Sequence, residues 1–153
     1  MKRLSLVLAA VALVGSSISS SAGTRGLGPQ AGVSINPDQF VFGLHLIVPI
    51  ADRADFVPSA DLGLGDHATT IALNGDVRVN VAPDEALRPY AGVGITWFNV
   101  DPSVAGVDSF HETGASLLGG IWLNKDGGTS YYLEARLGLG DVPDFKAMLG
   151  VNF

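Results

Sequence analysis

The sequence predicts an all-β fold, an eight-stranded antiparallel transmembrane β-barrel with short turns, preceded by a signal peptide. Three observations lead to this class: an N-terminal export segment, eight later segments in which apolar and polar residues alternate, and one such segment with charges along one face only. Beyond the export segment no apolar run is long enough for a spanning helix. A membrane chain of this kind must therefore close its strands into a barrel.

Residues 1–22 have the features of a secretory signal peptide. Two basic residues are followed by an apolar run of roughly 11 residues, well short of the ~20 that a membrane helix needs. Ser20 and Ala22 suit positions −3 and −1 of a cleavage site. We expect cleavage after Ala22, with residues 23–153 forming one outer-membrane β-barrel domain.

Composition excludes several classes of function for the mature chain. Without the two basic residues of the signal segment, seven Lys and Arg remain against 15 Asp and Glu, a net charge of −8. This acidic balance argues against nucleic acid as a partner. The chain has no cysteine, so neither disulfides nor cysteine-linked lipid are expected. Its 20 glycines favour strands with tight turns and crowded neighbours.

The mature chain divides into eight alternating segments separated by Pro, Gly, Asp and Asn. Most of them approach the ~9–11 residues of a tilted membrane strand, and the first is the shortest. The predicted strands cover residues 30–36, 39–50, 56–65, 68–81, 88–100, 111–123, 129–140 and 144–153.

The first half of the predicted barrel contains its most informative strand. A turn at 52–54 between the second and third strands would put His45 about opposite Asp61, a pair that could hold the imidazole protonated. The fourth strand has one wholly aliphatic face and one polar face. The aliphatic face carries Ile71, Leu73, Val77, Val79 and Val81, and the polar face carries Asn74, Asp76, Arg78 and Asn80.

The later strands alternate in the same way. The fifth places Ala91, Val93, Ile95 and Trp97 on one face and Tyr90, Gly92, Gly94 and Thr96 on the other. The sixth follows within 111–123. The seventh sets Tyr131, Leu133, Ala135, Leu137 and Leu139 against Glu134 and Arg136. The eighth alternates up to its final aromatic residue.

Charges and aromatic residues predict that the apolar faces point outward. A soluble barrel would bury its apolar face, whereas the lumen of a membrane barrel is polar. Aromatic residues of the outer faces fall near strand ends, where a bilayer interface selects them. Phe56, Tyr131 and Phe153 are expected at the periplasmic level, and Phe40, Trp97 and Phe145 at the external level.

Two motifs resemble those of known outer-membrane proteins. The chain ends on an aromatic residue behind alternating apolar ones, which resembles the C-terminal assembly signal of bacterial outer-membrane proteins. This signal would consist of Phe145, Ala147, Leu149, Val151 and Phe153. The sequence RPYAGVG at 88–94 resembles the "rPYxGxG" strand of small barrels of the OmpA, opacity-protein and OmpW type. The resemblance implies a bacterial outer-membrane location, contact with outer-membrane lipid and lipopolysaccharide, and the barrel-assembly machinery as a partner during biogenesis.

The predicted lumen is crowded with polar side chains. At mid-depth we expect His45, Asp61, Asn74, Asp76, Arg78, Glu134 and Arg136. A turn at about 82–87 between the fourth and fifth strands would place Asp76 and Arg78 roughly opposite Gly94 and Gly92, and Glu134 should similarly face near Gly150. These glycines fit the prediction, because large charged side chains need small neighbours in a narrow lumen. The alternatives are a closed, paired polar core and an ion path. The spacing of these residues supports no zinc site, and no cofactor is expected.

Acidic residues gather at the external turns. They are Asp38, Asp66, Asp101, Asp108, Glu112, Asp141 and Asp144. Lys146 is expected at the lumen mouth nearby, whereas the basic residues at 53, 88 and 125 fall on the periplasmic side. This rim either contacts anionic lipopolysaccharide through divalent cations, or a basic partner, or is a solvated edge that prevents aggregation.

Three functions stay open at this point. One is a structural or interaction barrel of the cell envelope, the second is a narrow, porin-like channel for small solutes, and the third is a lipid-modifying enzyme. The enzyme hypothesis comes from barrels that deacylate lipid A with a lipid-facing His and Ser two residues apart. Here His67 with Thr69 and His111 with Thr113 have that spacing, but Thr replaces Ser, and Glu112 points to the other face. We therefore expect no catalytic residues.

Overall fold

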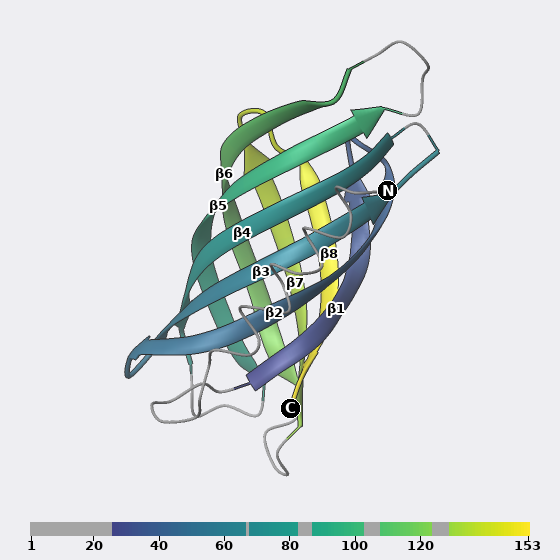
Figure 1. The fold of residues 1–153 in the computed structure, drawn as a ribbon. Coiled ribbons are helices and arrows are strands. Elements are labelled where there is room, and N and C mark those ends of the chain that lie inside the picture. Colours follow the sequence, from purple (N-terminus) through teal and green to yellow (C-terminus); the bar gives the residue numbers. More distant parts are fainter. Residues whose placement is uncertain (1–25, 67, 83–86, 103–107, 124–128) are drawn as a thin grey trace.

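A single closed barrel makes up the part of the chain that the computed structural model describes, residues 26–66, 68–82, 87–102, 108–123 and 129–153. Eight antiparallel strands each pair with their neighbours in the sequence, and the last strand closes onto the first (Figure 1). The strands are β1 Gly26–Ile35, β2 Gln39–Ala51, β3 Ala54–Leu64, β4 Ala68–Asn80, β5 Arg88–Pro102, β6 Phe110–Leu123, β7 Ser130–Leu139 and β8 Phe145–Asn152. The predicted fold class is confirmed.

The strand bounds agree with the sequence pattern to within two residues, except at the start of β1. This strand begins at Gly26, four residues before the predicted start. The sequence pattern missed this first part of the strand, because Gly26 and Gly28 contribute nothing to an apolar/polar alternation. Both glycines face inward against β8, where a Cβ at Gly28 would collide with the backbone of Val151. The absence of a side chain therefore permits the close pairing of the first and last strands.

The predicted signal peptide, residues 1–22, lies outside the described residues. Within the described ranges, no helix is long and apolar enough to cross a membrane.

The wall of the barrel is apolar outside and polar inside. On β4, Leu73, Val77 and Val79 are exposed, whereas Asp76 and Arg78 between them are buried. The same alternation occurs on β7, where exposed Leu133 and Leu137 flank buried Glu134 and Arg136. A folded chain in water would lose stability by exposing such a surface, and a bilayer removes that cost.

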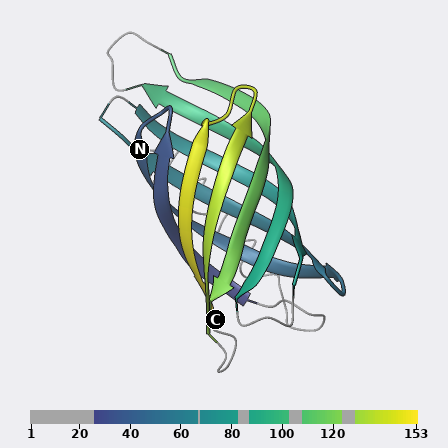
Figure 2. The ribbon, with the colours of Figure 1, turned by 180° about the vertical axis from the view of Figure 1, so that it is seen from behind.

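The two ends of the barrel differ in what they carry. Strands β1, β3, β5 and β7 end at one end of the barrel, which we call the turn end, and β1 begins at the opposite end, where the C-terminus also lies (Figure 1). Viewed from behind, β8 runs between β7 and β1 and completes the wall (Figure 2). Outward-facing aromatic residues occur near both ends. Phe40 and Trp97 are exposed toward the turn end, and Phe56, Tyr131 and Phe153 are exposed toward the other.

Candidate functional site

Four charged side chains meet in the middle of the lumen. Arg78 on β4 places Nη2 2.8 Å from Glu134 Oε2 on β7 and 3.9 Å from Asp76 Oδ2 on its own strand. Arg136 Nη2 lies 2.5 Å from Asp76 Oδ2 and 3.1 Å from Glu134 Oε1. All four side chains are at least nine-tenths buried. Each cation therefore contacts both anions, which offsets much of the cost of removing the four charges from water.

Glycines on the neighbouring strands make room for this charged group. Gly94 and Gly92 on β5 pair with Asp76 and Arg78, the register that the sequence predicted. A Cβ at Gly94 would collide with Oδ1 of Asp76. The glycines of the RPYAGVG segment therefore act in packing, since a larger residue would compete with the carboxylate for the same space.

Two tyrosine side chains contact the four central charged residues on the side away from the turn end. Tyr90 donates a hydrogen bond to Glu134 Oε2 at 2.9 Å. The guanidinium carbon of Arg78 lies 5.2 Å from the centre of the Tyr90 ring and 5.0 Å from that of Tyr132, within the range of cation–π attraction. Arg78 is thus held by a carboxylate at its tip and by aromatic rings around it.

A second polar group forms around Asp61 on β3. Gln30 on β1 donates to Oδ1, and Asn74 on β4 donates to Oδ2 at 2.9 Å. Lys146 on β8 places its ammonium 3.6 Å from the same Oδ2. Asn74 also accepts a 3.4 Å hydrogen bond from Arg136, which joins this group to the central one.

His45 does not pair with Asp61, because the register between β2 and β3 differs from the predicted one. His45 lies opposite Ser59, and Asp61 lies opposite Gly43. The β2–β3 turn holds only two residues, and an irregularity between Pro49 and Ala51 shifts the pairing by one further position. The imidazole instead contacts Asn152 Oδ1 on β8 through Nε2, and the Tyr132 hydroxyl lies 3.4 Å from Nδ1.

Glu134 also departs from the predicted neighbour. It pairs with Met148, and Gly150 pairs with Tyr132, whose ring occupies the space beside the glycine. The sequence pattern placed Gly150 beside the charged Glu134. In the barrel, Gly150 instead makes room for the ring of Tyr132, two residues before Glu134 on β7.

Most of the charged side chains in the lumen belong to one connected network whose charges balance. Tyr132 donates to Gln30 Oε1, and this links His45 to Asp61 and from there to the central group. The network contains three cations and three anions. They are Arg78, Arg136, Lys146, Asp61, Asp76 and Glu134. A further buried carboxylate, Asp55, lies outside it and accepts a 3.2 Å hydrogen bond from Asn80.

Apolar layers flank this network on both sides. Toward the turn end, Ala72, Phe98 and Val100 pack against Val142, which folds inward from the turn between β7 and β8. Gly114 leaves space for that turn, because a Cβ there would stand 2.6 Å from a methyl group of Val142. On the other side, Tyr90, Leu118 and Tyr132 pack together with Trp122. Buried apolar side chains thus lie on both sides of the charges.

The seven acidic residues assigned to the rim all lie toward the turn end. Six are exposed and one is not, because Glu112 occupies an inward-facing position of β6 and is half-buried. Asp144 accepts a 2.9 Å hydrogen bond from Asn36, which ties the last turn to the first. Lys146 lies deeper than the predicted mouth position, at Asp61. Within the described ranges, no three His, Asp or Glu side chains are grouped to hold a metal ion.

The remaining predicted residues that the structure describes lie on the outer wall. Thr113 and His111 are exposed on β6, and the His111 ring lies 6.5 Å from that of Trp97. Thr69 is half-buried on the outer face of β4, and His67 lies outside the described residues. The five residues of the proposed assembly signal all face outward and alternate with buried ones along β8. Their role in assembly stays a prediction.

Sequence reasoning missed several members of the network. Four side chains contact the predicted lumen residues but were not predicted to belong to the same network. They are Tyr132, Gln30, Asn152 and Lys146. The alternation itself could have found Tyr132, which shares the inward face of β7 with Glu134 and Arg136. Gln30 and Asn152 depend on closure between β1 and β8, which no local pattern reveals.

Comparisons with known proteins support the fold. No protein-family description and no curated protein sequence matches the chain. Among solved structures, the N-terminal β-barrel domain of Pseudomonas aeruginosa OprF superposes with a TM-score of 0.64 at 17% identity, covering 86% of this chain and 98% of that one. Neisserial surface protein A (NspA) superposes with a TM-score of 0.62 at 12% identity, covering 85% and 97%. The chain thus has the fold of small, OmpA-like outer-membrane β-barrels.

Proposed function

We propose that the chain is an integral outer-membrane barrel with a structural or interaction role in the envelope, and that its lumen is filled instead of conducting. The observation that carries this proposal is the charge-balanced network between two apolar layers. Eight strands leave an interior just wide enough for side chains. Paired charges that fill such a space stabilise the wall and leave little room for a solute.

The outer wall and the fold both support a location in the bacterial outer membrane. A belt of exposed Leu, Val, Ile and Phe side chains requires a bilayer around it, and the similar solved structures are outer-membrane barrels. Export through the signal peptide at 1–22 is part of this proposal. So are surrounding lipopolysaccharide and assembly by the barrel-assembly machinery.

Conductance in planar bilayers tests the filled lumen against the channel. Folded protein is first recognised by heat-modifiable migration, so that failure to insert is not mistaken for a closed pore. We expect no regular conductance steps from the folded chain. Regular steps that change in size on Arg78→Ala or Arg136→Ala would establish an aqueous path along these arginines, and the filled-lumen proposal would then be wrong.

A role in the envelope has its own readout. Cells that lack the chain should lose resistance to detergents, and the wild-type chain should restore it. A variant with an altered lumen that still assembles should restore resistance equally, because the proposed role depends on a stable barrel and on its surface. Restoration only by chains that conduct would favour the channel.

A further inference from the structure

Val142 is a turn residue whose side chain lies inside the lumen. It belongs to residues 140–144 between β7 and β8, which we call the plug turn and which Figure 2 shows in yellow near the top. The Val142 side chain is only 7% exposed. Among the described turn residues at this end, 36–38, 65–66, 108–109 and 140–144, it is the only buried one.

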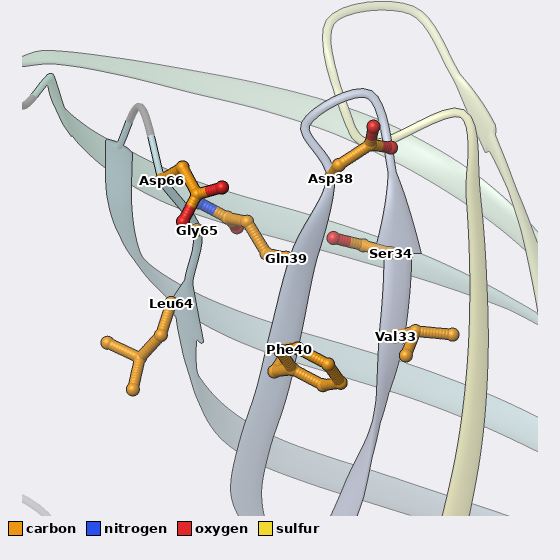
Figure 3. A pocket seen from close by; sticks show the side chains of 8 residues that line it. All are labelled: Val33, Ser34, Asp38, Gln39, Phe40, Leu64, Gly65 and Asp66. Carbon is orange, nitrogen blue, oxygen red and sulfur yellow. The ribbon is translucent and has the colours of Figure 1, made fainter.

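Other turn residues at this end remain at the surface. Asp38 and Asp66 are exposed at the upper edge of a groove whose lower part is formed by Val33, Phe40 and Leu64 (Figure 3). Those three apolar side chains are exposed and belong to the outward-facing wall. These turn residues therefore border the outer surface, whereas Val142 occupies the interior.

Val142 reaches the wall on the other side of the lumen. It packs against Ala72 on β4 and against Phe98 and Val100 on β5. In the closed sheet, β4 lies three strands from β7 and four strands from β8, the two strands that the plug turn joins. The interior of an eight-stranded barrel is just wide enough for side chains. A side chain that crosses this interior therefore obstructs the mouth.

Two inward-facing glycines make room for the plug turn. A Cβ at Gly114 on β6 would stand 2.6 Å from one methyl group of Val142, and a Cβ at Gly138 on β7 would stand 2.9 Å from the other. The backbone N–H of Gly138 also donates to the carbonyl oxygen of Asp144 at 3.0 Å. The inward position of the turn is thus supported by the strands beneath it.

The charged network begins directly below these apolar contacts. Thr96 lies two residues before Phe98 on β5, and its hydroxyl donates to Asn74 Oδ1 at 2.7 Å. The same oxygen accepts a 3.4 Å hydrogen bond from Arg136. A solute that entered along this side of the mouth would meet Val142 before it reached Arg136.

We propose that the plug turn closes the lumen at the turn end by holding Val142 in the mouth, and that small solutes reach the network from this end when the turn moves outward. The lumen then has two barriers in series, the plug turn and the charged network. This inference rests on the proposed filled lumen and assigns its closure at one end to a single short segment.

A single thiol can report access to the lumen, because the chain has no cysteine. Ser116 on β6 is 2% exposed, pairs with Gly138, and its hydroxyl has no hydrogen-bond partner among the described residues. Ser116→Cys therefore places a thiol below the plug turn without breaking a contact of the network. Folded protein in detergent, identified by heat-modifiable migration, is treated with the cationic reagent trimethylammonioethyl methanethiosulfonate, and mass spectrometry follows the labelled fraction.

Matched variants in this background test the plug turn. Val142→Ala should raise the labelling rate about tenfold, because two buried methyl groups no longer hold the turn and labelling requires its local opening. Asp141→Ala removes an exposed side chain of the same turn and should leave the rate unchanged. Gly114→Ala should also raise the rate, because the added methyl group displaces Val142. Gly119→Ala, on the outer face of the same strand, should not.

The dependence of labelling on urea separates opening of the turn from unfolding of the barrel. Opening of the turn exposes little surface, so the raised rates should stay nearly constant at low urea concentration, whereas labelling through global unfolding rises steeply. If Val142→Ala labels as slowly as Asp141→Ala, or only through global unfolding, the plug turn is wrong and the filled lumen stands. If Ser116→Cys with the turn unchanged labels as fast as the protein unfolded in urea, the lumen is open and both proposals fail.

Discussion

Arg78 Nη2 lies 2.8 Å from Glu134 Oε2, although the two residues belong to β4 and β7, which are three strands apart in the sheet. The pair crosses the lumen, and both side chains are almost fully buried. Each side of the wall thus supplies one partner of a buried ion pair. A change at either residue should affect the whole barrel, because it leaves an uncompensated charge in the interior.

Arg78→Ala should reduce the free energy of unfolding by about 3–5 kcal/mol, because Glu134 loses its nearest cation. Urea or guanidinium unfolding in lipid vesicles measures the change. Arg53→Ala is the control. It removes the same side chain from an exposed turn and should change the free energy of unfolding by less than about 0.5 kcal/mol. Equal effects of the two changes would contradict the buried pair.

Two adjacent glycines of β6 should differ sharply in their tolerance of alanine. A Cβ at Gly120 would collide with the Tyr90 ring, so Gly120→Ala should destabilise by about 1–3 kcal/mol. A Cβ at Gly119 would meet only the carbonyl oxygen of Tyr90 at 3.7 Å, an ordinary contact. Gly119→Ala should therefore be nearly neutral. The same unfolding experiment compares them, and a larger loss at Gly119 would reverse the assignment of faces on β6.

Two adjacent tyrosines of β7 provide a similar contrast. Tyr132 is fully buried and its hydroxyl donates to Gln30, so Tyr132→Phe leaves an amide oxygen without its partner and should cost about 1–3 kcal/mol. Tyr131 is exposed on the outer wall, and Tyr131→Phe should have little effect. If both changes are neutral, the hydroxyl of Tyr132 does not connect the lumen network.

An arginine on the outer wall should reveal the depth of each position in the bilayer. Val77 lies on the outer face within β4, farther from the end of the strand than Val81, and Val77→Arg should cost about 2–4 kcal/mol in vesicles. Val81 follows the end of the same strand, where Val81→Arg should cost about 0–1 kcal/mol. Normal folding of Val77→Arg would show that this face of β4 does not meet lipid.

The sequence was sufficient to predict which side chains of a strand share a face. Period-two alternation assigned Leu73 and Val77 to one face of β4 and Asp76 and Arg78 to the other, and the charges along the second face indicated which one points inward. It failed only where glycine interrupts the pattern, at the start of β1. Face and strand number follow from local geometry, because every second side chain points to the same side of any strand.

The pairing of Asp76 and Arg78 with Gly94 and Gly92 was predicted from the sequence, but only the tertiary structure decided which side chains meet around His45 and across the lumen. His45 contacts Asn152, 107 positions away, instead of Asp61, because a two-residue turn and a local irregularity set the register of β2 against β3. Arg78 meets Glu134 because eight strands close with a particular stagger and bring β4 and β7 together across a narrow lumen. Register and closure are properties of the whole sheet, so no single segment of the sequence specifies them.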